Sequence, residues 1–122
     1  MPIRRIKPLE GIASVRAVLA DSSKRVNSDA DFKAAVRYLL EEMSFLRPGK
    51  SVEVRVPPLG AVQCIEGLTH KRGTPPNTVE LAATDWFALA VGEVSWESLV
   101  SSGRILASGT RSDISEVFPI WR

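Results

Sequence analysis

A chain of 122 residues suits one domain, and its 44% hydrophobic and 25% charged residues are ordinary globular values. Its net charge of +2 does not indicate a nucleic-acid binder, and its single cysteine excludes an internal disulfide, which favours a cytoplasmic location. No run approaches the roughly 18 apolar residues of a membrane span, and the basic start lacks the apolar run of a secretory signal. We expect a single domain over residues 1–122, with residues 1–27 forming a basic N-terminal helix and loop.

Positive charge is concentrated in the first half of the chain. Residues 1–56 contain 11 Lys/Arg and 7 Asp/Glu, whereas residues 57–122 contain 5 and 7. The simplest interpretation of the basic residues is a solvated helix face. The alternative is weak attraction to an anionic membrane or polyanion, worth about 1 kcal/mol for each basic residue near the surface.

The first predicted element is a helix over residues 8–21. Pro8 suits its first turn, and apolar residues recur from Leu9 to Leu19 at a spacing of three to four. Gly11 weakens this helix by roughly 1 kcal/mol relative to alanine. A polar loop follows.

The second predicted helix has the clearest pattern. Ser28 is a candidate N-cap with Asp31 three residues later, and Pro48 with Gly49 ends the helix. One stripe of the helix is apolar: Phe32, Val36, Leu39, Met43 and Leu46. Lys33 and Arg37 face away from that stripe.

Three predicted strands follow. Residues 52–56 alternate valine with charged residues, as in a half-buried strand. Residues 61–66 are more apolar, which predicts a strand nearer the centre of the sheet. Residues 78–81 form the third strand, with Val79 and Leu81 pointing inward.

The last third of the chain predicts two short helices and a strand. Thr84 caps residues 85–91, and Ser95 caps residues 96–102. Residues 104–109 form a further strand, and Asp113 opens a final helical turn that ends before Pro119. Helices and strands in this order predict a small α+β fold.

The segments 84–92 (TDWFALAVG), 95–99 (SWESL) and 103–109 (GRILASG) resemble the sterol carrier protein 2 family. The segments 52–58 (VEVRVPP), 60–67 (GAVQCIEG) and 70–77 (HKRGTPPN) are similar to one branch, the uncharacterised bacterial sterol-carrier-like proteins of actinobacteria. Together these matches cover about residues 28 to 120.

The resemblance implies a twisted sheet of about five strands, covered by helices, with an apolar pocket between the layers. The broader family binds fatty-acyl chains, sterols and other lipids without catalysis, and it supplies a domain fused to mycothiol-dependent enzymes. The present chain departs from the lipid carriers because it lacks their long amphipathic C-terminal helix and has a long connection over residues 68–77.

An apolar and aromatic set in the C-terminal half is the predicted lining of a pocket for a hydrophobic ligand: Trp86, Phe87, Leu89, Leu99, Ile105 and Phe118. This assignment depends on the resemblance, and ordinary core packing is the alternative. A dry cavity of about 300 Å³ would cost roughly 7 kcal/mol, comparable to the whole stability of a small domain. The pocket therefore holds a ligand, is a shallow cleft, or has closed.

The connection over residues 68–77 is the second candidate site. His70, Arg72, Gly73 and Asn77 belong to a candidate loop for an anion or a protein partner, in which the guanidinium of Arg72 is suited to a carboxylate or phosphate. A solvated loop is the simpler interpretation.

Cys64 lies within a predicted strand, where a thiol is usually a small buried hydrophobe. A Cys64–His70 nucleophile and base is the less favoured alternative.

No cluster of Cys, His, Asp and Glu has metal-ligand spacing, so we expect no metal or cofactor. The sequence thus predicts a non-catalytic domain that binds a small hydrophobic or amphipathic molecule. The alternative is a protein-interaction module with a filled pocket, related to the domain of the mycothiol-dependent enzymes. The oligomeric state stays open.

Overall fold

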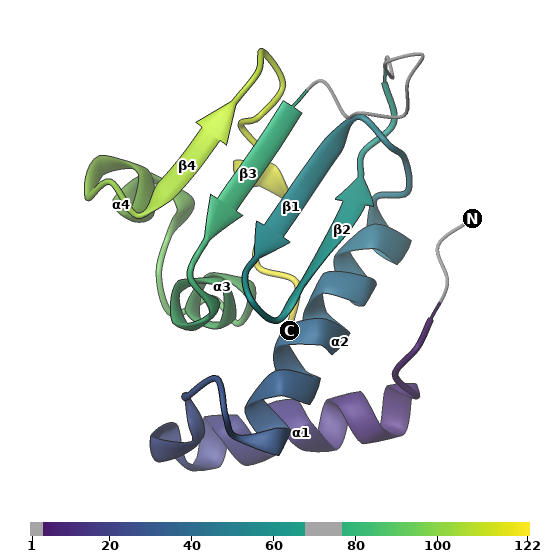
Figure 1. Ribbon diagram of the computed structural model, residues 1–122, viewed down its shortest axis with the longest axis vertical. Coiled ribbons are helices and arrows are strands. Elements are labelled where there is room, and N and C mark those ends of the chain that lie inside the picture. The colour runs from purple at the N-terminus through teal and green to yellow at the C-terminus, as the bar shows by residue number, and fades with distance from the viewer. Residues whose placement is uncertain (1–3, 68–76) are drawn as a thin grey trace.

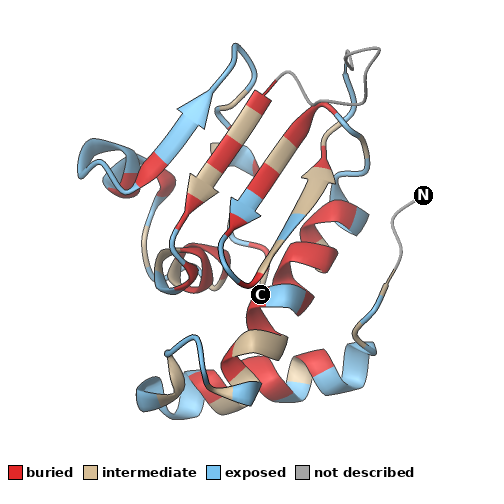
Figure 2. Ribbon diagram, in the orientation of Figure 1, coloured by how far each residue is buried: buried red, intermediate tan, exposed pale blue. Residues whose placement is uncertain are grey.

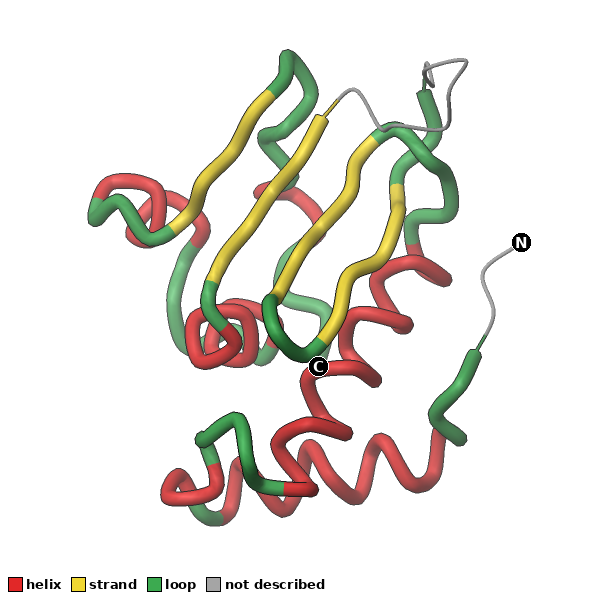
Figure 3. The backbone as a smooth tube through the Cα atoms, in the orientation of Figure 1, coloured by secondary structure: helices red, strands yellow, loops and turns green. Residues whose placement is uncertain are grey.

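The computed structural model describes residues 4–67 and 77–122. Its chain trace is shown in Figure 1, and the elements are separated by type in Figure 3. The elements are, in order, α1 (Pro8–Ala20), the 3-10 turn η1 (Ser22–Lys24), α2 (Ala30–Leu46), β1 (Val52–Val56), β2 (Gly60–Cys64), β3 (Asn77–Leu81), α3 (Ala83–Ala90), α4 (Trp96–Ser101), β4 (Ile105–Ser108) and η2 (Ser115–Val117).

The strands form one mixed sheet in the order β2-β1-β3-β4. β1 pairs antiparallel with β2 and parallel with β3, and β3 pairs antiparallel with β4. The α+β class predicted from the sequence is confirmed. The described residues contain four strands, where the resemblance implied about five.

Helices cover one face of the sheet, and the other face is open to solvent. α2, α3 and the C-terminal segment lie behind the sheet in Figure 1, and α1 crosses the lower part of α2. Along β1, the buried valines alternate with half-buried Glu53 and exposed Arg55, as the colours of Figure 2 show. Val79 and Leu81 are buried on the covered side, as predicted.

The prediction that the second strand lies near the centre of the sheet is wrong, because β2 is an edge strand. The crossover between β1 and β3 places these two strands side by side and in parallel, which makes β1 central. The apolar character of β2 does not come from burial on both faces. Val62 and Cys64 lie on the face covered by α2, whereas Ala61 and Gln63 lie on the open face and are small or neutral residues.

The predicted caps are right for one helix and wrong for two. Ser95 caps α4 by accepting a hydrogen bond from Ser98 N at 3.1 Å. α2 is capped by Asp29 instead of Ser28, because the Asp29 carboxylate accepts from Phe32 N at 2.9 Å. α3 begins at Ala83 without a side-chain cap, so Thr84 lies inside its first turn.

An ion pair links the segment after η1 to the loop between α3 and α4. Arg25 donates to both carboxylate oxygens of Glu93, at 2.6 and 2.8 Å, and these hydrogen bonds lower the pKa of Glu93. The Glu93 side chain is 42% exposed, so the pair stabilises the fold by at most about 1 kcal/mol. A carboxyl with a lowered pKa contributes this stability above its ordinary pKa of 4.5 and loses it as the pH falls through the folded value.

We therefore expect Glu93→Gln to unfold slightly more easily than the wild type at pH 7, with the two proteins converging below about pH 4. Urea unfolding at a series of pH values would measure this difference. A difference that stayed constant down to pH 3 would contradict the assignment.

Across the described ranges 4–67 and 77–122, no helix is long and apolar enough to cross a membrane.

Candidate functional site

A groove of about 1140 Å³ runs between α2 and the outer edge of β2, with which no strand of residues 4–67 and 77–122 pairs. The N-terminal segment, the end of α2 with the residues that follow it, and the turn before β2 complete its walls. Its lining is Arg5, Ile6, Ser28, Ala30, Lys33, Ala34, Arg37, Leu40, Glu41, Ser44, Pro48, Gly49, Lys50, Leu59, Gly60, Ala61, Val62 and Gln63.

The floor of the groove is apolar and built largely from small side chains. Ala30 and Ala34 lie one helical turn apart on α2, and the buried residues Leu40 and Leu59 also contribute to the lining. Gly60 adds to this space, because even a Cβ at this position would come no closer than an ordinary van der Waals contact, 3.5 Å from Leu40 Cδ1. The small residues therefore leave room between a helix and a strand that larger side chains would fill.

Four basic side chains surround this floor: Arg5, Lys33, Arg37 and Lys50. Glu41 is the only acidic residue among the described residues of the lining, and its carboxylate accepts hydrogen bonds from the backbone N–H groups of Arg5 and Ile6 at 3.1 to 3.2 Å. Glu41 thus anchors the N-terminal segment against α2. The groove keeps an excess of positive charge, which attracts anionic groups.

At the end of the groove near the β1–β2 turn, the Arg37 guanidinium connects α2 to that turn. Its Nε donates to Leu59 O at 2.8 Å, although the residue as a whole is exposed. At the opposite end, Ile65 has a backbone φ of 66°, and its N–H donates to Arg47 O at 2.7 Å. A β-branched residue in this conformation is costly. These two contacts join the ends of β2 to the helical layer.

The predicted anion or partner loop is only partly described by the structure. His70, Arg72 and Gly73 lie outside the described residues. Asn77 is 3% exposed, and both ends of its amide are bonded: Nδ2 donates to Ser51 O and Oδ1 accepts from Arg111 N, each at 2.8 Å. Asn77 therefore connects the start of β3 to the residue before β1 and to the segment after β4.

The six predicted ligand-binding residues lie in the protein core. Trp86, Phe87, Leu89, Leu99 and Ile105 are buried, and Phe118 is partly buried against them. The ring of Phe118 lies edge-on to the ring of Trp86, with 5.8 Å between the ring centroids, and stacks on the ring of Trp96, with 6.1 Å between the centroids. Phe87 packs instead against Phe32 of α2 at 5.9 Å. None of the six lines the groove.

Cys64 is fully buried on the covered face of β2. Burial raises the pKa of its thiol to about 12, so the neutral form dominates at physiological pH. A thiol in this environment behaves as a small hydrophobe, the favoured interpretation of the sequence. Among residues 4–67 and 77–122, no group of three or more His, Cys, Asp and Glu side chains could hold a metal ion.

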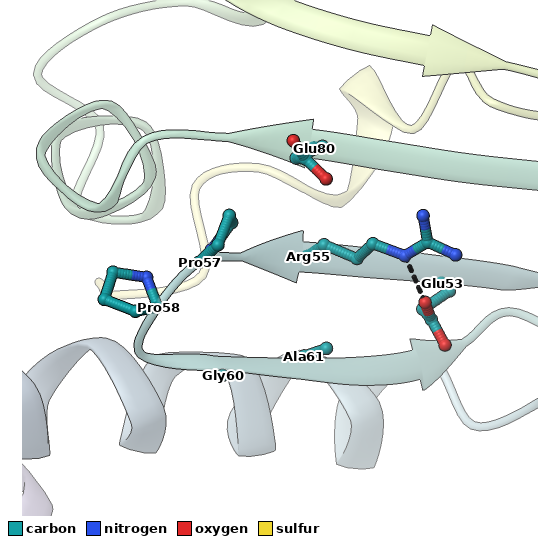
Figure 4. Close-up of a pocket in the computed structure, with 7 residues that line it drawn as sticks. All are labelled: Glu53, Arg55, Pro57, Pro58, Gly60, Ala61 and Glu80. Atoms are coloured by element: carbon teal, nitrogen blue, oxygen red, sulfur yellow. Dashed lines mark hydrogen bonds and ion pairs between the residues drawn. The ribbon is translucent and has the colours of Figure 1, made fainter.

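The open face of the sheet carries a shallow depression of about 340 Å³ at its β1–β2 end (Figure 4). Arg55 points along β1 and pairs with Glu53, and Glu80 lies opposite Arg55 on β3. Because Arg55 lies between two carboxylates and pairs with one of them, this depression has the character of an ordinary solvated sheet face.

A family model described as bacterial SCP ortholog matches residues 28–120, which is well over half of the chain. The chain belongs to this family of bacterial SCP orthologs. The resemblance to sterol-carrier-like proteins is therefore confirmed, and the chain has an SCP2-like α+β fold. No curated protein matches the chain.

The matched range of the SCP ortholog family contains α2, the four described strands and the aromatic cluster formed by Trp86, Trp96 and Phe118, whereas α1 lies outside it. The family suggests a lipid-carrier-like domain. Sequence reasoning missed the groove because it assigned Lys33 and Arg37 to a solvated face of α2. The signal was the pair of alanines beside them, Ala30 and Ala34, which leave that face hollow.

Proposed function

We propose that this SCP ortholog is a non-catalytic domain that binds a small hydrophobic or amphipathic molecule. The observation that carries the proposal is the α2–β2 groove, which has an apolar floor and a basic rim within a family of carrier-like proteins. Its volume of about 1140 Å³ is slightly above the usual size of ligand pockets, about 300–1,000 Å³, so it is large enough for such a molecule.

The groove also avoids the energetic problem of an empty internal pocket. A closed dry cavity of ligand size would cost roughly 7 kcal/mol, whereas an open groove fills with water when no ligand is bound. An amphipathic ligand would cover Ala34, Leu40 and Val62 with its apolar part. Its polar end would remain at the basic rim.

The aromatic site predicted around Trp86 and Phe87 is the alternative location for the same ligand. Trp86 and Phe87 are both 0% exposed, so a ligand between them would have to displace side chains that are already packed. Binding there requires α3 and α4 to separate from the sheet. Binding in the groove requires no such opening.

Native mass spectrometry with added fatty acids and fatty acyl-CoA tests the function. We expect a one-to-one complex with at least one of these amphiphiles, and binding weakened by about tenfold or more in Ala34→Phe, which fills the groove floor. Ala13→Phe, on the exposed side of α1, is the matched control and should bind as the wild type does. Uptake of neither class of ligand would contradict the proposal.

Tryptophan fluorescence separates the two locations. All three tryptophans lie outside the groove, and Trp86 and Trp96 belong to the aromatic cluster. A ligand in the groove should leave the emission nearly unchanged, whereas a ligand among the predicted residues should shift it. Persistence of binding in Ala34→Phe together with an emission shift would assign the site to the aromatic cluster.

A further inference from the structure

The outer edge of β2, which no described strand covers, directs backbone groups toward the groove. Ser51 N donates to Ile65 O at 3.0 Å. This bond shows which residue pairs of β1 and β2 are hydrogen-bonded to each other and which are not. Bonded and non-bonded pairs alternate along antiparallel strands, so Ala61 and Gln63 bond to β1. The N–H and C=O groups of Val62 consequently point away from β1, toward the edge.

β2 lacks the features that usually protect an edge strand. Such strands commonly carry lysine, proline or a bulge that prevents another strand from pairing with them. The residues of β2 are Gly60, Ala61, Val62, Gln63 and Cys64, all small or neutral, and the described residues form no bulge between β1 and β2. The edge is therefore able to accept another strand.

The charges beside this edge select what can pair with it. Lys33 and Arg37 flank the Gly60 end, and Lys50 lies beyond the Gln63 end. Neither Lys33 nor Lys50 forms an ion pair with another described residue. A second copy of the chain would bring the same cations against themselves, which opposes pairing of two β2 strands. An acidic segment would meet favourable charges at both ends.

We propose that the β2 edge binds an extended acidic segment of a partner protein, which adds to the sheet as a fifth strand. Backbone hydrogen bonds to Val62 provide pairing, and Lys33, Arg37 and Lys50 provide the preference for acidic side chains. A segment of five residues spans about 17 Å, which matches the length of β2. Alternate side chains of the segment point into the groove and cover its apolar floor.

This partner site goes beyond the proposed small-molecule function and does not depend on it. The added strand overlaps the groove, so the segment and an amphipathic ligand compete for one space. Binding of the segment to the ligand-free protein is measured without any ligand. Failure of either proposal therefore leaves the other testable.

A blocked pentapeptide with glutamate at both ends and three valines between them is the probe, titrated into the full chain labelled with ¹⁵N; its first, third and fifth side chains share one face, so both glutamates and the central valine can face the groove. Two control peptides accompany it: one with lysine in place of glutamate, and one with N-methylated backbone amides, which keeps the charge but cannot pair. We expect only the unmethylated acidic peptide to bind, with the largest shifts at the amides of Gly60, Val62 and Cys64.

Variants of the protein separate strand pairing from charge. Val62→Pro removes the outward N–H, a change that edge strands tolerate, and should weaken peptide binding by about tenfold or more. Lys33→Gln should weaken it by about two- to fivefold. Arg16→Gln, on the exposed side of α1, should leave the affinity unchanged.

Three results would overturn the proposal. The first is equal binding of the N-methylated or the lysine peptide, which would exclude strand addition or charge selection. The second is no binding of the acidic peptide at millimolar concentration. The third is slow hydrogen exchange of the Val62 amide in the free protein, because that would mean that the edge is already paired.

Discussion

Replacing Trp86 by alanine should lower the free energy of unfolding by about 3–5 kcal/mol, the largest effect that we expect from a single change. Trp86 is 0% exposed, and its ring packs edge-on against Phe118. Its indole Nε1 also donates to Val36 O at 3.2 Å, which links α3 directly to α2. The substitution therefore creates a cavity where the two helices and the C-terminal segment meet.

Chemical denaturation followed by circular dichroism would measure this loss. Trp86→Phe retains part of the ring and should cost about 1–3 kcal/mol, because the hydrogen bond from the indole to Val36 O is lost and the smaller ring leaves a void. Leu106→Ala, at a side chain that is 67% exposed on β4, is the control and should change stability by no more than about 0.5 kcal/mol. A loss below about 1 kcal/mol in Trp86→Ala would mean that the aromatic cluster does not hold the fold together.

Gly11→Ala should destabilise the protein by about 1–3 kcal/mol, although helix propensity alone predicts a gain of about 1 kcal/mol. Gly11 is buried in α1 where that helix crosses α2. A Cβ at this position would overlap the Tyr38 ring and lie 2.9 Å from Tyr38 Cβ. The atoms that it meets lie near the root of the tyrosine side chain, so a simple rotation of the ring tip would not relieve the overlap.

A double-mutant cycle tests this explanation. In a Tyr38→Ala background, Gly11→Ala should become neutral or stabilising, because the overlapping ring has been removed. The measurement is the change in the free energy of unfolding caused by Gly11→Ala, compared between the wild-type and the Tyr38→Ala backgrounds. Equal costs in both backgrounds would show that Tyr38 is not the cause.

The candidate groove and the aromatic cluster show how far the sequence could predict a site. The aromatic residues were conspicuous in the sequence, and the structure places them together, but as packed core. The groove was not apparent, since its lining comes from residues 5 to 63 and none of those residues is unusual by itself. A hollow between two elements depends on what side chains leave unfilled, and one-dimensional periodicity does not record that.

Local patterns determined the elements of this protein. Periodic apolar positions and proline and glycine breaks were enough for α1, α2, β1 and β3, because these signals act between residues a few positions apart. Tertiary structure alone decided that β1 is central and β2 lies at the edge, and that Gly11 serves a close crossing of α1 and α2. Those outcomes depend on contacts between residues distant in the chain, which the local pattern does not encode.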